Sequence, residues 1–151
     1  VQLYPDAEYD VNDPDLEPGN DCNGHGTHVA GTVDGSKYGV AKDVNLISVR
    51  VFSCRGITSE SRVIQGVDWI TENAIKPAVV NMSLGGAAFE PLDIAIENSI
   101  SAGINYAISA GNGNTDACLQ SPARTPSAIT VGASMITNER AGFSNLSGKT
   151  S

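Results

Sequence analysis

Short apolar runs alternate along the chain with longer stretches in which apolar residues recur every third or fourth position. The runs are rich in β-branched residues and predict strands over residues 45–51, 78–82, 104–109 and 128–133. The longer stretches predict helices over 63–74 and 91–103. Ser59 and Ser61 offer cap chemistry before the first helix, and Pro77 stops it. Pro91 opens the second helix and Gly103 closes it.

Two further segments have a different pattern of polar and apolar residues. Residues 1–24 are acidic, rich in turn residues and without an apolar period, which predicts a surface loop or an extended segment. Residues 25–33 are small and apolar on all sides, as in a fully buried helix. Strands that alternate with helices predict an α/β fold with three layers, a parallel sheet flanked by helices on both faces. Ligands bind such sheets beyond the carboxyl ends of the strands.

Composition narrows the class of protein. The formal net charge is −8, whereas proteins that bind nucleic acid carry basic patches. No apolar run approaches the ~20 residues that span a membrane, and no signal peptide is visible at Val1. The first residue is not Met, so we expect the true N-terminus upstream. The three cysteines, an odd number, are compatible with one free thiol, a missing partner or three buried thiols.

Residues 23–32, Asn-Gly-His-Gly-Thr-His-Val-Ala-Gly-Thr, hold the first candidate chemistry. His25 opens a helix of small residues, and a neutral imidazole titrating near pH 6.5 can act as a general base. One alternative is a buried histidine satisfied by hydrogen bonds. Another is a metal site through His25 and His28, which share a helix face. Zinc there would need Asp or Cys ligands, because the chain has no further histidine.

Two more motifs follow strand ends, at the edge where ligands bind. Residues 81–86, Asn-Met-Ser-Leu-Gly-Gly, could be only a strand followed by a tight turn. Residues 109–112, Ser-Ala-Gly-Asn, could be only a β-turn. Each of these two motifs is unspecific when it is considered alone.

Residues 23–32 resemble the active-histidine signature of the subtilases (peptidase S8), and 81–86 and 109–112 follow in family order. With the flanking segments, the resemblance covers residues 21–145 and is strongest to the proteinase K-like branch. It implies a subtilisin-like fold and a serine endopeptidase with an Asp/His/Ser triad. His25 falls on the catalytic histidine, and Asn112 falls on the asparagine that donates to the oxyanion. Substrate-binding positions fall on Gly56, Ser83, Leu84, Gly85, Gly86, Ala110 and Gly111.

The resemblance also implies a disulfide between Cys22 and Cys54, worth about 3–4 kcal/mol in the chain-entropy treatment. Cys118 is expected to be free. The chemistry needs no cofactor. Structural calcium is compatible with the acidic residues 10–21, although a solvated loop explains them equally well. A second family calcium site near Pro126 and Ala128 is in doubt, because Ser151 stands near the position of its aspartate.

The catalytic aspartate and serine of the family are expected before Val1 and after Ser151. We therefore expect residues 1–151 to be a partial peptidase domain, incomplete at both ends, with a core over 25–151. Residues 1–151 alone are expected to have no hydrolytic activity by the triad mechanism. The parent protein is expected to be a secreted monomer that acts on polypeptides, with no nucleic-acid or membrane partner. The alternative is a catalytically inactive subtilase-like binding or structural module.

Overall fold

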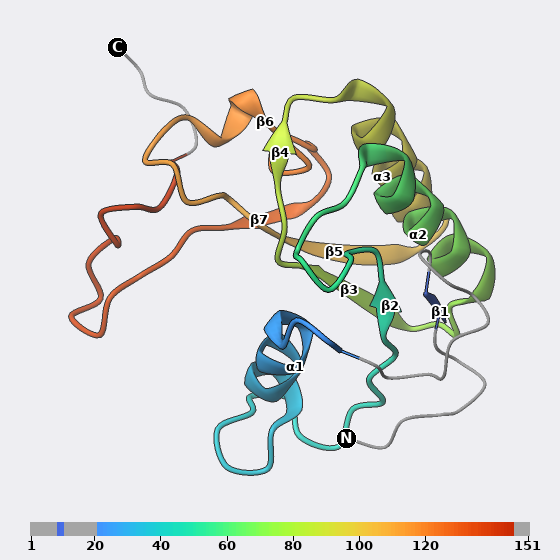
Figure 1. Ribbon diagram of the computed structural model, residues 1–151, viewed down its shortest axis with the longest axis horizontal. Helices are drawn as coiled ribbons and strands as arrows, with labels where there is room; N and C mark the ends of the chain where they lie inside the picture. The colour runs from blue at the N-terminus through green and yellow to red at the C-terminus, as the bar shows by residue number, and fades with distance from the viewer. Residues whose placement is uncertain (1–8, 11–20, 147–151) are drawn as a thin grey trace. The chain divides into compact units, whose positions relative to one another are not determined.

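The computed structural model describes residues 9–10 and 21–146 of the chain. The chain divides into two compact units, Val1–Trp69 and Ile70–Ser151. Figure 1 labels the helices and strands of both. Among the described residues, no helix is long and apolar enough to cross a membrane. The expectation of one partial domain over the whole chain stays a prediction.

The first unit contains a short parallel sheet. β1 (Tyr9–Asp10) pairs with β2 (Val49–Arg50). Within the part of the chain that the structure describes, the strand predicted over 45–51 is thus confirmed over Val49–Arg50. β1 belongs to the acidic segment 1–24, for which a loop or an extended segment is predicted, and most of that segment lies outside the described residues.

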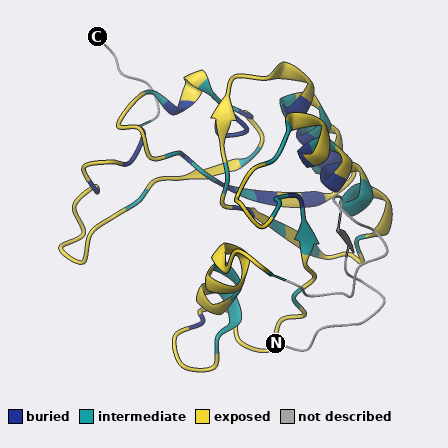
Figure 2. Ribbon diagram, viewed as in Figure 1, coloured by how far each residue is buried: buried dark blue, intermediate teal, exposed yellow. Residues whose placement is uncertain are grey.

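α1 (His25–Asp34) forms where the small apolar run predicts a helix, but the prediction of full burial is wrong. No residue of α1 is buried, and Val29, Ala30 and Val33 are half-buried; Figure 2 shows the helix in the colours of exposed and intermediate residues. Small side chains allow a neighbour to pack closely. They do not specify that such a neighbour is present, so composition predicts the helix better than its burial.

α2 (Glu60–Asn73) confirms the helix predicted over 63–74, and the boundary between the two units falls within it. In the first unit it packs closely on the strand that precedes it. Gly66 is buried, and a Cβ there would lie 2.7 Å from a methyl carbon of Val51. Val63 and Val67 are buried on the same helix. Glycine at position 66 is therefore what permits this close approach.

The second unit is built on a three-stranded parallel sheet in the order β3-β5-β7. β3 (Ala78–Met82) and β5 (Ile104–Ser109) pair over five residues, and β7 (Ile129–Val131) pairs with the end of β5. α3 (Glu90–Ser101) crosses from β3 to β5 (Figure 1). Parallel strands joined through a helix confirm the predicted α/β class.

α3 begins and ends near the proline and the glycine that were predicted to bound it. Pro91 lies in its first turn with two acidic residues, which suit the positive end of the helix dipole, and Gly103 adopts φ = 93° just after it. The helix buries Leu92 and Ile96 against β5, whose alternate residues Ile104, Tyr106 and Ile108 are also buried (Figure 2). This packing forms the core of the second unit.

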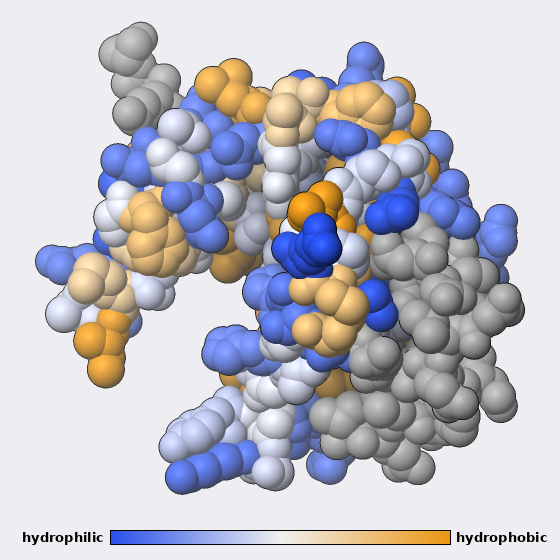
Figure 3. Space-filling model, viewed as in Figure 1, coloured by the Kyte–Doolittle hydropathy of each residue, from blue (hydrophilic) through white to orange (hydrophobic). Residues whose placement is uncertain are grey.

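The opposite face of the same sheet is less covered. The strand register places Val79, Asn105, Ala107 and Ile129 on that face. Val79 is 73% exposed and Ile129 is 64% exposed. On the side of the molecule that Figure 3 presents, hydrophobic residues are interspersed with hydrophilic ones. Within the second unit, the described residues thus leave apolar side chains on this sheet face in contact with solvent.

A second, antiparallel pair of strands was not predicted. β4 (Gly86–Ala87) pairs with β6 (Gln120–Ser121), which directly follows the short 3-10 helix η1 (Ala117–Leu119). Gly86 lies opposite Ser121. The pair joins the Gly-Gly motif after β3 to a segment more than thirty residues away, and it forms part of the candidate site.

Candidate functional site

His25 is the first residue of α1, and Asp21 fixes the start of that helix. The Asp21 carboxylate accepts hydrogen bonds from the backbone N–H groups of Gly24 and Thr27, each at 2.7 Å, and from the Thr27 hydroxyl at 2.8 Å. Gly24 adopts φ = 92° at the N-cap position. The free N–H groups of a helix start are satisfied in this way by a residue outside the helix.

These bonds lower the pKa of the Asp21 carboxyl. The backbone N–H of Thr27 contributes most and that of Gly24 next, and the pKa falls from 3.8 to about 2. Asp21 is therefore ionised at neutral pH, with its charge at the positive end of the helix. The sequence implicates Asp21 only as one of the acidic residues 10–21 that are compatible with structural calcium, and its role at the start of α1 was missed; an acidic residue a few positions before a predicted helix start was the available signal.

The disulfide between Cys22 and Cys54 is present, as the resemblance implies, with the two Cα atoms 5.0 Å apart. Next to it, the Asn23 side-chain amide donates to the Cys54 carbonyl at 3.3 Å. Gly56, a predicted substrate-binding residue, follows in a tight turn with φ = 70°. The loop after β2 is thus tied to the residues just before His25. Cys118 is a free, exposed thiol, as expected.

The second and third motifs meet at one hollow in the second unit. It has a volume of about 290 Å³. The residues that line it are Ser83, Leu84, Gly85, Gly86, Ser109, Gly111, Asn112 and Gln120. Six of the eight are predicted site residues; Ser109 and Gln120 are additions. The Ser109 hydroxyl donates to the Leu84 carbonyl at 3.1 Å, which joins the two motifs directly.

Asn112 stands at this hollow with its amide available. Its side chain is exposed, and within residues 9–10 and 21–146 it makes no hydrogen bond. Ala110, also predicted as substrate-binding, is buried and lines a separate hollow of about 340 Å³. His25 belongs to the first unit and Asn112 to the second.

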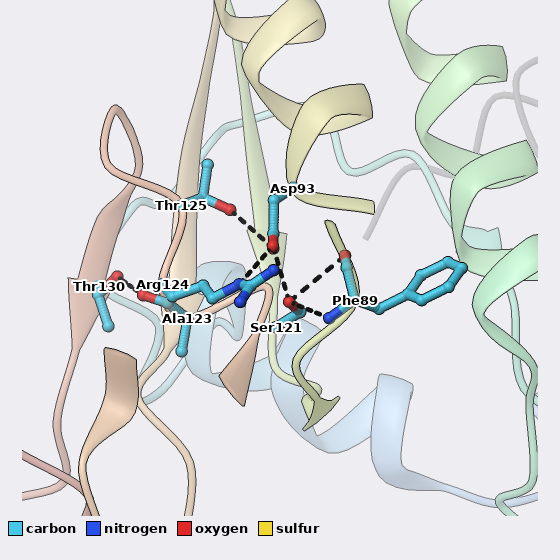
Figure 4. Close-up of polar contacts among 7 residues, drawn as sticks. All are labelled: Phe89, Asp93, Ser121, Ala123, Arg124, Thr125 and Thr130. Carbon is cyan, nitrogen blue, oxygen red and sulfur yellow. Dashed lines mark hydrogen bonds and ion pairs between the residues drawn. The ribbon is translucent and has the colours of Figure 1, made fainter. Parts of the chain in front are cut away.

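Polar contacts hold the outer wall of the hollow, formed by β4 and β6, to the start of α3 (Figure 4). Arg124 Nε lies 2.6 Å from Asp93 Oδ2 in an ion pair. The Ser121 hydroxyl donates to the same Asp93 oxygen at 2.9 Å and accepts from the Phe89 backbone N–H at 2.8 Å. Asp93 is thus a shared anchor for the strand that carries Gln120.

Metal binding has little support among the described residues. They contain no group of three or more His, Cys, Asp or Glu side chains placed to hold an ion, so His25 and His28 gather no third ligand there. The calcium sites considered from sequence stay predictions, because residues 11–20 and Ser151 lie outside the described part of the chain.

Known proteins resemble the chain closely. The model of the Subtilase family matches residues 2–150. The extracellular serine proteinase of Thermus sp. (strain Rt41A) is 60% identical over 125 residues, covering 83% of this chain and 30% of that protein. The alkaline serine exoprotease A of Vibrio alginolyticus is 53% identical over 137 residues, covering 91% of this chain and 26% of that protein. The chain thus spans less than a third of either relative.

A solved structure supports the same relationship. The crystal structure of a cold adapted subtilisin-like serine proteinase superposes with a TM-score of 0.88 at 51% sequence identity. The superposition covers 92% of this chain and 52% of that one. With a family match over nearly the whole sequence and this likeness of fold, the chain belongs to the Subtilase family of subtilisin-like serine proteases.

Proposed function

We propose that the protein containing this sequence is a secreted serine endopeptidase in which His25 is the general base and Asn112 stabilises the oxyanion. The observation that carries the proposal is the hollow lined by Ser83–Gly86, Gly111 and Asn112. An unbonded amide beside a strand-end motif suits a site where a peptide carbonyl develops negative charge.

The catalytic aspartate and serine are proposed to lie outside residues 1–151. The serine oxygen attacks the scissile carbonyl carbon while His25 takes the hydroxyl proton. The carbonyl electron pair moves onto the oxygen, which accepts hydrogen bonds from the Asn112 amide and a backbone N–H. As the C–N bond breaks, His25 gives the proton to the leaving amine. Water then hydrolyses the acyl-enzyme by the same steps, and no cofactor is required.

The substrate is proposed to be an extended polypeptide lying along Ser83–Gly85, and Gly56 is proposed as a further substrate-binding residue. An added strand pairs through its backbone N–H and C=O groups, so recognition depends little on side chains. Gly85 and Gly86 leave room for such an approach. These residues therefore suit an enzyme that cleaves many sequences.

Secretion is supported by the Cys22–Cys54 disulfide, because such bonds form and persist in oxidising compartments. The Thermus relative is itself named extracellular. We propose the same location for this protein, as a monomer.

The test begins with the reading frame that contains this sequence. The proposal expects an Asp-Ser/Thr-Gly motif upstream and Gly-Thr-Ser-x-Ala downstream. The full-length protein should cleave peptide substrates and react with a fluorophosphonate serine probe. His25→Ala should lower kcat by about 10⁶-fold and Asn112→Ala by about 10²–10³-fold, values carried over from subtilisin rather than worked out from this structure.

His28→Ala is the matched control, since it removes a second exposed histidine from the same helix. It should leave kcat nearly unchanged. An intact, folded full-length protein that hydrolyses no peptide and takes no probe would overturn the proposal and leave the inactive binding or structural module. Residues 1–151 expressed alone should be inactive.

A further inference from the structure

Asn145 is a buried polar residue to which the proposed chemistry gives no role. It follows β7 and the long loop after it, and it is only 2% exposed. It is the last residue of the segment 21–145 over which the sequence resembles the subtilases, and that resemblance assigns it no function. In the structure the Asn145 side chain reaches back to the loop that carries Asn112, which we call the Asn112 loop (residues 110–115).

The acceptor side of the Asn145 carboxamide holds the second half of this loop. Oδ1 accepts from the backbone N–H groups of Gly113 at 2.9 Å and Thr115 at 3.0 Å. The Thr115 hydroxyl donates to the same oxygen at 3.3 Å. These contacts lie directly after Asn112 in the chain, so they restrain its backbone from the C-terminal side.

The donor side holds the first half. Nδ2 donates to the Ala110 carbonyl at 2.9 Å and to Oε1 of Gln120 at 2.9 Å. The Asn145 backbone N–H donates to the Gly111 carbonyl, also at 2.9 Å. One residue therefore binds the loop on both sides of Asn112 and also holds Gln120, a lining residue of the 290 Å³ hollow.

The approach is close enough to dictate the residue at position 111. Gly111 adopts φ = 99°, and a Cβ there would lie 2.5 Å from Asn145 Nδ2. Both hydrogen atoms of the Asn145 amide and its carbonyl oxygen have partners, so the carboxamide is fully used inside the fold. A buried group with so many partners fixes their geometry, because each alternative arrangement would leave a polar atom unsatisfied.

We infer that Asn145 is a positioning residue for the oxyanion hole, which holds Asn112 in place through the backbone on either side of it. The inference rests on the proposed function for its catalytic meaning. Asn145 does not line the hollow itself and touches no substrate in this scheme; it acts through Asn112 and Gln120.

Asn145→Asp is the sharpest perturbation because it keeps the size and the Oδ1 acceptor. Its second oxygen would face the Ala110 carbonyl and Oε1 of Gln120, both of which are acceptors. Gln120 can turn its amide to donate, but the Ala110 carbonyl cannot. The start of the Asn112 loop should therefore shift. A displacement of about 1 Å in a catalytic group lowers the rate by about 10²-fold, and we expect a fall of this size in kcat with a smaller change in KM.

A double-mutant cycle in the full-length protein separates positioning from general stability. If Asn145 acts through Asn112, adding Asn145→Asp to Asn112→Ala should lower kcat by less than a further twofold or so, within the usual error of additivity. An equal fold-loss in both backgrounds would overturn the inference, because the effect would then not pass through Asn112.

Ser99→Ala is the matched control. Ser99 is fully buried in the same unit, accepts from the Tyr106 hydroxyl at 2.8 Å and the Thr71 hydroxyl at 2.7 Å, and does not line the hollow. The Ser99→Ala variant should have a lower melting temperature but should not show the fall in kcat expected for Asn145→Asp. A similar fall in kcat for Ser99→Ala would mean that activity only follows stability.

Amide hydrogen exchange tests the positioning without requiring activity. In Asn145→Ala the amides of Gly113 and Thr115 should exchange about two- to tenfold faster, the change expected for losing one hydrogen bond. The same amides should be unchanged in Ser99→Ala. Unchanged exchange in Asn145→Ala would overturn the inference even for an active enzyme. An inactive wild type with faster exchange in Asn145→Ala would overturn the proposed function alone and support the positioning.

Discussion

The carboxylate of Asp21 offers a stability prediction with a defined pH dependence. Asp21→Asn replaces one acceptor oxygen by an NH₂ group that would point at the backbone N–H of either Gly24 or Thr27. In the wild type both of these donors lie 2.7 Å from the carboxylate. The variant therefore loses hydrogen bonds to a charged acceptor and places two donors against each other at the start of α1.

The size of the effect follows from the lowered pKa. A folded pKa of about 2 in place of 3.8 corresponds to about 2.4 kcal/mol at most, at 1.36 kcal/mol per pH unit. Because the group is partly exposed, solvent screening reduces this, and we expect about 1 kcal/mol. A pKa that is lower in the folded than in the unfolded state means that the ionised carboxylate stabilises the folded state. The contribution is therefore complete above pH 3.8, declines as the pH falls, and is lost below about pH 2.

The assay is denaturant unfolding of the full-length protein in a His25→Ala background, which prevents self-digestion. The free energy of unfolding of Asp21→Asn should be lower by about 1 kcal/mol at pH 6 and should approach that of its parent near pH 2. Asp34→Asn is the control: Asp34 ends the same helix, where a negative charge is unfavourable, so its removal should not destabilise. A loss for Asp21→Asn that is the same at every pH would refute the electrostatic reasoning.

Two further predictions concern the disulfide of the first unit and the ion pair of the second. Replacing both Cys22 and Cys54 by Ser should lower the free energy of unfolding by about 3–4 kcal/mol, because the bridged residues are 32 apart; Cys118→Ser should leave it unchanged, and equal losses would contradict the disulfide's role. Arg124→Gln should lower the free energy of unfolding by about 1–2 kcal/mol, since its partner Asp93 is only 13% exposed. An unchanged melting temperature in a thermal scan would show that the ion pair contributes nothing to stability.

Local chemistry made much of the fold predictable. Residues 91–103 predict a helix and α3 runs over Glu90–Ser101, since proline and glycine act on the few bonds around them. The strands predicted over 78–82 and 104–109 have the same bounds in the structure, and each begins directly after a helix-ending residue, Pro77 or Gly103. The hollow also joins two motifs that sequence had placed at strand ends.

The features that the sequence did not predict depend on contacts between residues far apart in the chain. The strands β4 and β6 are two residues each and exist only because Gly86 and Ser121 meet across more than thirty residues. Asn145 reads as an ordinary polar residue until its bonds to Gly113 and Ala110 are seen. Periodicity reports which face of an element is apolar; it does not report which distant polar atom a side chain will satisfy. The mistaken burial of α1 has the same cause.

The long reach of Asn145 has a consequence for the growing chain. Asn145 lies 35 residues after Ala110, the carbonyl to which its side chain donates. Ribosomes add about 5–20 residues per second, so roughly 2–7 s separate the synthesis of the two positions. By the end of that interval the residues of β5 and of the Asn112 loop have been synthesised, but the side chain that fastens the loop is only then added. Asn112, which we propose as the oxyanion donor, can thus be held in its final position only late in the synthesis of this segment.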